Sequence, residues 1–406
     1  MLKKTLNYLI FSILSSVIGF LTIAYMARTI SQESMGVVGL FMAMLFIAPQ
    51  FVSFASTGLI SINKVKYSRE DFSDFSKSYL SFGFVNFIFI FIMSCFGGVI
   101  FKGYWQIFVL LPVIAFLMFI VSFHQTELVQ DGLSKIYGIY NLLLSAFTAI
   151  LTVLFLSVFS LDWEGRLWAI LFGQMIIVFT MYKLTFDTLR EFKAVIDKIL
   201  FKEFFYFGAP LFIGLGAGWV LNQADNYIVL YFFTLEDVGL YAVAYSIGAI
   251  VNTINKAATN AIVPRLYKSL EKKEGHKIVR KLNIYFSVSI VVISLIIGLS
   301  SYWYMPLIFG DKYANTGDIV LFISLAFGFN GIYRTSGGVI SFYKRNTLQM
   351  NLIYLSAVVN IVISIILIPH LGMLSPAIGT FVAYIVLAYL SYVYGWKILK
   401  EEEFVH

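Results

Sequence analysis

Long apolar runs, separated by short polar segments, repeat along the whole chain. A helix needs roughly 20 apolar residues to cross the hydrocarbon core of a bilayer, because each residue advances it by about 1.5 Å. Lipid offers the backbone no hydrogen-bond partner, so such runs must be helical. The pattern predicts twelve membrane-spanning helices, at residues 6–30, 36–61, 78–100, 105–128, 137–159, 166–184, 204–233, 237–262, 281–308, 317–341, 348–368 and 374–397.

The composition supports this prediction, since 60% of the 406 residues are hydrophobic and only 13% are charged. An average soluble domain has about twice that share of charged residues. We therefore expect an all-α polytopic membrane protein. The single cysteine, Cys95, rules out a disulfide framework, and the four histidines lack the spacing of a zinc site. No Gly-Lys dipeptide occurs, so the nucleotide-binding loop is missing, and neither a cofactor nor a metal is expected.

The distribution of basic residues predicts the orientation. With the N-terminus inside, twelve spans place 23 of the 29 Lys and Arg residues on the cytoplasmic side and only Arg28, Lys102, Arg166 and Lys312 near the outer side. This is the positive-inside bias, and it predicts a multi-pass protein of the cytoplasmic (inner) membrane with both termini cytoplasmic. Basic loops facing an anionic leaflet also account for the net charge of +7 without nucleic acid.

The loops on the predicted outer side are all short, the longest being residues 311–316. Membrane glycosyltransferases, polymerases and ligases that act on lipid-linked sugars generally need a large outer loop or an acidic catalytic motif. The chain has neither, so we expect a transporter and not an enzyme. Without a nucleotide-binding loop, its energy must come from an ion gradient, such as H+ or Na+, or from a partner.

A six-residue pattern, [ST]-x-E-x-x-G, follows the first span at 31–36 and the seventh span at 234–239. In each copy the hydroxyl is expected to cap the next helix, and the glycine to allow close packing. Two ordinary helix caps would give the same pattern, but the matched positions favour a duplication into six-helix bundles at 1–200 and 201–406. Since six is even, both halves would have the same topology and enclose a central cavity.

Three charged residues lie inside predicted spans, where a charge normally faces a cavity or a partner and marks function. Lys256 and Arg334 reach a similar depth in the cytoplasmic half, and together they could bind an anionic head group. Alternatively, Lys256 extends to the inner interface, or Arg334 bonds helix carbonyls. Asp225 is either a proton or cation site or a structural hydrogen-bond acceptor.

In the first half, Arg28 closes the first span, while His124 and Glu127 lie near the inner end of the fourth. Arg28 could be an interface anchor or a contact for substrate. His124 could titrate near neutral pH or be a satisfied interfacial residue, so His124 and Glu127 are candidates for ion coupling or for structure.

Glycine and proline are concentrated in the seventh span. Membrane helices bend or break at these residues. This span is therefore a predicted hinge, formed by Gly208, Pro210, Gly214, Gly216 and Gly218.

Several short motifs together resemble a known family: Lys-Lys-Thr-Leu at 3–6, the segment 27–36, Gly-Ala-Pro-Leu at 208–211, Gln-Ala-Asp-Asn-Tyr-Ile at 223–228 and the segment 238–245. The chain resembles the polysaccharide biosynthesis protein family, and within it the O-antigen and capsule repeat-unit flippases. These are similar to other members of the multidrug/oligosaccharidyl-lipid/polysaccharide exporter (MOP) superfamily.

The resemblance implies two six-helix lobes in a V that move an undecaprenyl-diphosphate-linked oligosaccharide to the outer leaflet by alternating access. Lys256 and Arg334 would then be cationic cavity residues, Asp225 the acidic residue of the seventh span and Arg28 the arginine that closes the first. Its partners would be the lipid-linked oligosaccharide, membrane lipids, and polysaccharide polymerase and chain-length proteins. In the first half, groups such as Ser53, Asn141 or Gln174 would have to supply polar contacts. The alternative function is a cation-coupled multidrug antiporter.

Overall fold

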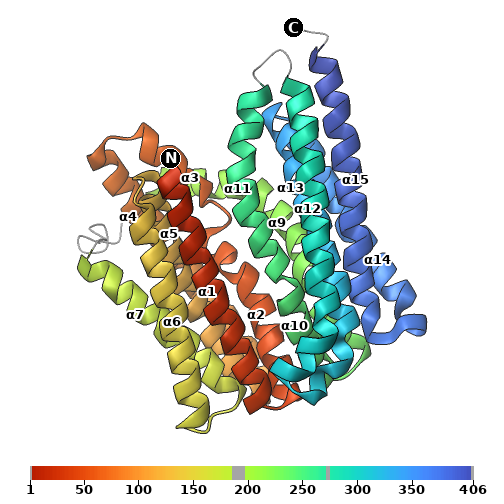
Figure 1. Ribbon diagram of the computed structural model, residues 1–406. Coiled ribbons are helices and arrows are strands. Elements are labelled where there is room, and N and C mark those ends of the chain that lie inside the picture. The colour runs from red at the N-terminus through yellow and green to blue at the C-terminus, as the bar shows by residue number, and fades with distance from the viewer. Residues whose placement is uncertain (1, 185–196, 271–274, 404–406) are drawn as a thin grey trace. The chain divides into compact units, whose positions relative to one another are not determined.

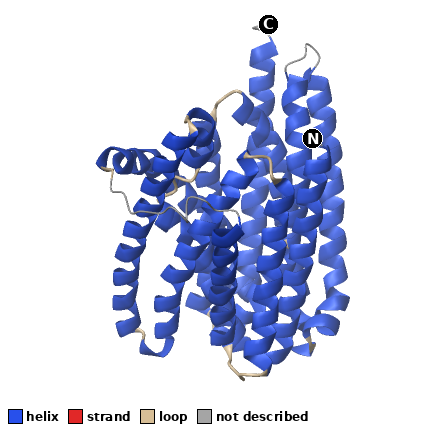
Figure 2. Ribbon diagram, turned by 90° about the vertical axis from the view of Figure 1, so that its left-hand side faces the viewer, coloured by secondary structure: helices blue, strands red, loops and turns tan. Residues whose placement is uncertain are grey.

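The computed structural model describes residues 2–184, 197–270 and 275–403, which form helices joined by short loops and contain no strand (Figures 1 and 2). The basic segments 183–202 and 265–281, which join predicted spans on the cytoplasmic side, lie partly outside these ranges. The α-helices are α1 (Leu2–Thr29), α2 (Gln32–Ser53), α3 (Gly58–Lys66), α4 (Arg69–Ile100), α5 (Trp105–Gln130), α6 (Ser134–Ser157), α7 (Trp163–Leu184), α9 (Lys198–Phe232), α10 (Leu235–Gly248), α11 (Ile250–Leu270), α12 (Gly275–Tyr304), α13 (Gly317–Phe342), α14 (Asn346–Leu371) and α15 (Ser375–Glu403).

Eleven helical stretches among the described residues are long and apolar enough to cross a membrane. The last of them, Asn346–Glu401, contains both α14 and α15, which are separated at the short helix η4 (Gly372–Leu374). The prediction of an all-α membrane protein with about twelve spanning helices is therefore confirmed.

Two of the predicted spans are interrupted. The span predicted at 36–61 is wrong at its end, because α2 stops at Ser53 and α3 begins only at Gly58. Phe54 and Ala55, in the turn between them, have φ angles of 49° and 55°, in the left-handed region that a helix cannot contain. The span predicted at 237–262 is divided into α10 and α11 at Ala249.

The helices pack into two compact units. Unit 1 contains Met1–Thr22 and Leu40–Gly216, and unit 2 contains Ile23–Gly39 and Ala217–His406. Unit 2 thus includes the end of α1 and the beginning of α2, and α9 passes from unit 1 to unit 2 after Gly216. The division of the sequence into duplicated halves at residue 200 stays a prediction.

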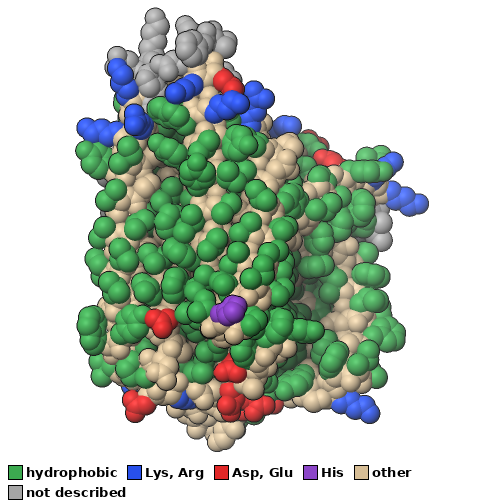
Figure 3. Space-filling model, turned by 90° about the vertical axis from the view of Figure 1, so that its right-hand side faces the viewer, with side chains coloured by type: hydrophobic (Ala, Val, Ile, Leu, Met, Phe, Trp, Pro, Cys, Tyr) green, Lys and Arg blue, Asp and Glu red, His purple; other side chains and the backbone are tan. Residues whose placement is uncertain are grey.

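The surface is apolar where a soluble protein would be polar. Along α12, exposed side chains recur every three or four residues and form one continuous apolar face: Ile284, Val288, Val292, Leu295 and Leu299. Figure 3 shows apolar side chains across the middle of one face, with lysine and arginine gathered at the top, where α12 begins and α15 ends. Such a band suits a hydrocarbon environment with basic residues at one interface.

Aromatic side chains form the core of unit 1. The ring of Tyr79 on α4 lies 5.4 Å from that of Phe119 and 5.7 Å from that of Phe123, both on α5. The ring of Phe204 on α9 packs edge-on against Tyr79 at 5.2 Å. The first half of α9 is therefore held to α4 and α5 by aromatic packing, at separations typical of favourable ring pairs.

The repeated six-residue pattern behaves as predicted. The Ser31 hydroxyl accepts a hydrogen bond from the Ser34 amide at 3.0 Å, and Thr234 forms a capping box with Asp237. The two turns also face each other within unit 2. A Cβ atom at Gly36 would overlap the Leu235 carbonyl oxygen, and one at Gly239 would overlap that of Gln32. Each glycine thus abuts the second residue of the other turn, the reciprocal contact expected of two copies of one motif.

Candidate functional site

The structure brings Lys256 and Arg334 together, on the neighbouring helices α11 and α13 of unit 2. The charge of Arg334 acts directly on Lys256. Close approach of the helices depends on Gly331, because a Cβ atom there would lie 2.9 Å from Cγ of Asn255 on α11. The Asn255 amide in turn donates to the Phe327 carbonyl oxygen at 2.5 Å, which fastens α11 to α13.

Two carboxamides complete this site, which we call the cationic patch: Asn252, Lys256, Asn330 and Arg334. Arg334 Nε donates to Asn330 Oδ1 at 2.8 Å, and Arg334 Nη2 donates to Asn252 Oδ1 at 3.4 Å. These partners are side-chain amides, and not the helix carbonyls that the sequence left as an alternative. Arg334 is partly buried, whereas Lys256 is exposed on unit 2.

The charge of the cationic patch is uncompensated. None of the ion pairs found among the described residues includes Lys256 or Arg334. Asparagine oxygens orient a guanidinium without neutralising it, so two positive charges persist side by side in an apolar unit. An anion with several oxygens, such as a phosphate or diphosphate, is the ligand that such a pair binds best.

Asp225 lies at the centre of a buried polar network in unit 2 and is only 1% exposed. Its Oδ2 atom accepts hydrogen bonds from the Tyr241 hydroxyl and from Thr380 Oγ1, both at 2.7 Å. Asn360 Nδ2 donates to the same Thr380 oxygen at 2.7 Å. Within the described residues, Asp225 Oδ1 and Asn360 Oδ1 are buried and have no hydrogen-bond partner. These oxygens form a group able to hold a proton or a small hard cation.

Tyrosines connect Asp225 with the cationic patch. The Tyr384 hydroxyl donates to Asn222 Oδ1 at 3.1 Å, one helical turn before Asp225 on α9. Tyr384 also lies near enough to both Arg334 and Asp225 for their charges to act on its side chain. Tyr384 is therefore a neighbour of both the acidic and the basic group of unit 2.

His124 and Glu127 lie together on α5 in unit 1, and both are buried. Glu127 Oε2 is 3.3 Å from His124 Nδ1, and Glu127 Oε1 is 3.4 Å from Nζ of Lys64 on α3. Both side chains thus have ionic partners within unit 1, and their role in ion coupling stays a prediction.

Arg28 lies elsewhere in unit 2, among residues of the α12–α13 connection. Its guanidinium donates to the carbonyl oxygens of Leu307 and Ile308, in the π-helical turn η2 (Met305–Phe309). Lys312 Nζ donates to the Ile30 carbonyl oxygen at 3.0 Å. Arg28 and Lys312 also line an open depression of about 900 Å³. In this structure Arg28 pins the end of α1 to η2, and its predicted contact with substrate stays untested.

The predicted hinge residues lie on α9, around its passage from one unit to the other after Gly216. A Cβ atom at Gly216 or Gly218 would meet nothing within 4 Å, so neither glycine is packed against a neighbour, although Ala217 between them is buried. Gly208, by contrast, is packed directly against the Phe54 carbonyl. The point where α9 leaves unit 1 lies between Gly214 and Gly218, and the open space at Gly216 and Gly218 suits a bend of the helix. Pro210 lies within the same helix.

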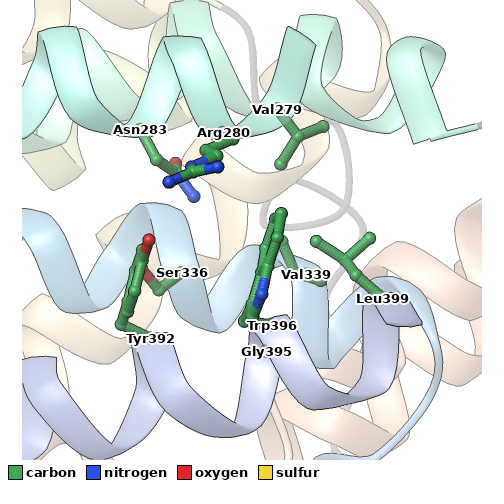
Figure 4. Close-up of a pocket in the computed structure, with 9 residues that line it drawn as sticks. All are labelled: Val279, Arg280, Asn283, Ser336, Val339, Tyr392, Gly395, Trp396 and Leu399. Carbon is green, nitrogen blue, oxygen red and sulfur yellow. The ribbon is translucent and has the colours of Figure 1, made fainter. Parts of the chain in front are cut away.

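A small cavity lies at the end of unit 2 where α12 begins and α15 ends (Figure 4). Its volume is about 10 Å³, the space of one water molecule. The guanidinium of Arg280 lies 5.5 Å from the centre of the Trp396 ring beside it. The cavity is too small for a sugar, and among the described residues no group of three or more His, Cys, Asp or Glu is arranged to hold a metal.

Several site residues were missed by the sequence reasoning. Asn252 and Asn330 each precede a cation by four residues, so each pair shares a helix face, and this spacing could have identified them. Thr380, Asn360 and Lys64 are separated from their partners by 155, 20 and 63 residues, and no local signal pointed to them.

Solved structures share this fold across nearly the whole chain. The lipid II flippase MurJ in an inward closed conformation is 14% identical with a TM-score of 0.78, over 96% of this chain and 87% of that chain. An inward-facing multidrug resistance MATE family transporter of the MOP superfamily is 14% identical with a TM-score of 0.74, over 98% of both chains. The chain therefore has the all-α, multi-pass fold that MurJ and the MATE family transporters share.

The sequence comparisons specify the family. The model of the family described as polysaccharide biosynthesis protein matches residues 1–270, so the chain belongs to that family. Lsg locus putative protein 1 of Haemophilus influenzae is 23% identical over 284 residues, which cover 67% of each chain. The uncharacterized membrane protein MJ1068 of Methanocaldococcus jannaschii is 22% identical over 249 residues, or 58% of this chain and 46% of that protein. The chain is a membrane transporter of polysaccharide biosynthesis, as its motifs predicted.

Proposed function

We propose that this transporter moves undecaprenyl-diphosphate-linked oligosaccharide repeat units across the cytoplasmic membrane, by alternating access, for O-antigen or capsule assembly. The observation that carries the proposal is the cationic patch, in which two uncompensated cations lie beside each other on α11 and α13. Arg334 would bind phosphate oxygens in a bidentate manner and Lys256 as a point charge. The carboxamides of Asn252 and Asn330 hold the guanidinium in place.

The comparisons support a lipid-linked substrate. The family is named for polysaccharide biosynthesis, and MurJ, whose fold is similar, is named as a flippase for a lipid. A diphosphate is common to all substrates of the proposed class, whereas the sugars vary. A site that recognises the diphosphate therefore leaves the glycan free to differ. Polysaccharide polymerase and chain-length proteins would act on the product.

The proposed energy source is an H+ or Na+ gradient, with Asp225 as the coupling site. Its carboxylate, the Asn360 oxygen and Thr380 Oγ1 supply hard oxygen ligands in a dry interior. The bend required for alternating access would occur in α9 between Gly214 and Gly218. In the proposed orientation both termini and the basic loops face the cytoplasm.

A second candidate function is cation-coupled multidrug antiport. The buried carboxylate of Asp225 and the MATE-like fold favour it. Cationic drugs, however, would be repelled by the cationic patch, since like charges in an apolar unit cost free energy. Deletion of the gene should therefore leave drug susceptibility unchanged.

The test is complementation of a deletion strain, with surface polysaccharide measured at equal amounts of protein in the membrane. Lys256→Gln and Arg334→Gln should each lower surface polysaccharide at least tenfold, while Lys256→Arg should retain most of it. Lys397→Gln is the matched control, because Lys397 is 69% exposed and pairs only loosely with Glu401, at 3.9 Å. Wild-type polysaccharide in both charge-removing variants would refute the assigned role.

A further inference from the structure

Unit 1 contains a group of charged side chains, with the buried His124 and Glu127 at its centre, that the proposed transport mechanism does not use. Lys64 Nζ on α3 lies 3.4 Å from both Glu127 Oε1 on α5 and Asp131 Oδ2, in the residue that follows α5. The second oxygen of Glu127 is 3.3 Å from His124 Nδ1. The His124 side chain is 3% exposed and that of Glu127 10%, so these charges interact with little screening by solvent.

The charges of this group do not balance while His124 is neutral. Lys64 contributes one positive charge, and Glu127 and Asp131 contribute two negative charges. The helices around α5 carry further charged residues, namely Lys66 on α3, the ion pair of Lys77 and Asp74 on α4, Lys135 on α6 and Lys183 on α7, while the ring of Tyr140 on α6 is edge-on to His124 at 6.2 Å. A proton on His124 would give the buried Glu127 carboxylate a cationic partner at 3.3 Å, and buried charges are most stable when they are paired.

The same group of charged side chains fixes α3 against α5, and the turn that precedes α3 packs against α9. The ammonium of Lys64 also lies 4.6 Å from the centre of the Phe72 ring, so three contacts fix this short helix through one side chain. The turn before α3 is strained, with positive φ angles at Phe54 and Ala55, neither of which is glycine. A turn of this kind persists only where surrounding contacts hold it.

Those contacts come from α9. The Phe54 ring is stacked against Phe205 at 4.7 Å and against Phe212 at 5.2 Å, and the Phe54 carbonyl lies against Gly208. Any movement of α3 is therefore transmitted by the four-residue turn at 54–57 to the part of α9 that precedes the proposed hinge.

We propose that His124 and Glu127, with Lys64 and Asp131, form a proton-binding site in unit 1 that sets how firmly α3 is held against α5. Proton uptake tightens the site, and through the turn at 54–57 it fixes the first half of α9. The use of this site in transport rests on the proposed function. The site itself does not, because proton binding is measured without substrate.

Proton binding is tested by NMR of the purified full-length protein, labelled at histidine, between pH 5.5 and 8.5. The imidazole signals of His124 should titrate within this range and should disappear in His124→Asn. His370→Asn is the matched control, because His370 on α14 is exposed and belongs to unit 2. A His124 signal that stays unchanged across the range would overturn the proposal.

The hold on α3 is tested by a spin label at position 65, introduced as Val65→Cys in a Cys95→Ser background. Val65 is 78% exposed and follows Lys64 on α3, so the label reports the helix without entering the core. Its rotational rate should be at least twofold lower at pH 6 than at pH 8. His124→Asn should abolish this difference, Glu127→Gln should give fast motion at both pH values, and His370→Asn should preserve the wild-type response.

The label in the otherwise unchanged protein already gives a decisive result, so the test does not depend on how the variants fold. Equal motion at pH 6 and pH 8, or an undiminished pH response in His124→Asn, would overturn the proposal. Failure of the polysaccharide complementation test would leave both outcomes unaffected, because neither measurement uses substrate.

Discussion

The cationic patch depends on close packing at Gly331, and Gly331→Ala tests this dependence. The new methyl group would lie 2.9 Å from Asn255 Cγ and 3.0 Å from Nδ2, and it would overlap Oδ1. Asn255 is fully buried, and its amide is held by the hydrogen bond to the Phe327 carbonyl oxygen. The change must therefore either separate α11 from α13 or break the Asn255 to Phe327 hydrogen bond.

The magnitude follows from three effects. Overpacking a helix contact costs about 1–3 kcal/mol, and leaving a buried hydrogen-bonding group unpaired costs about 1–3 kcal/mol. Alanine favours a helix over glycine by about 1 kcal/mol, which offsets part of this cost. With either cost at the middle of its range, about 2 kcal/mol, the net destabilisation is about 1 kcal/mol. Unit 2 has the size at which that lowers Tm by about 2–4 °C.

The assay is thermal unfolding of the purified protein, with Gly218→Ala as the matched control. Gly218 is also helical and also belongs to unit 2, but a Cβ atom there meets nothing within 4 Å. Gly218→Ala should therefore unfold at the wild-type temperature or above, and Gly331→Ala clearly below it. If both variants shifted Tm equally, the packing of α11 against α13 at Gly331 would not hold the patch together.

Three further predictions concern the polar network and the repeated turns. Thr380→Val should lower Tm, because it removes a donor to the buried Asp225, and Thr380→Ser should restore it. Gly36→Ala and Gly239→Ala should each destabilise the contact between the two turns, and a double-mutant cycle in thermal unfolding should show non-additivity, because they disrupt the same contact. Tyr384→Phe should leave the amount of protein in the membrane unchanged but flatten the dependence of transport on pH or sodium; a wild-type dependence would refute the connecting role of Tyr384.

The helices were predictable because lipid imposes one rule on the sequence: about 20 apolar residues for each crossing. The caps at Ser31 and Thr234 were predictable for a similar reason, since their partners lie three residues away. Local patterns of this kind do not depend on how helices pack. The prediction failed at Phe54 and Ala55, where packing against α9 holds two ordinary residues in a conformation that favours glycine.

The residues of the candidate site differ in the same way in how far the sequence predicts them. A charge inside an apolar run is visible in the sequence, so Lys256, Arg334 and Asp225 could be identified without a structure. Their partners are ordinary polar residues on other helices, such as Thr380, whose significance comes only from burial beside a charge. For Arg28 the sequence left an interface anchor and a substrate contact open, and no local pattern pointed to the backbone carbonyls of η2 to which its guanidinium donates.

The arrangement of unit 2 suggests how the proposed coupling of a cation to an anionic substrate would work. Tyr384 lies near enough to both Asp225 and Arg334 for the charges of both to act on its side chain. In the proposed mechanism, a proton or cation bound at Asp225 removes a negative charge from this neighbourhood and so changes the field at Arg334. Linkage requires the reverse effect as well, so an anion bound at Arg334 must change the affinity of Asp225 for its cation by the same factor. Coupling of this kind requires no movement of Asp225 towards the patch.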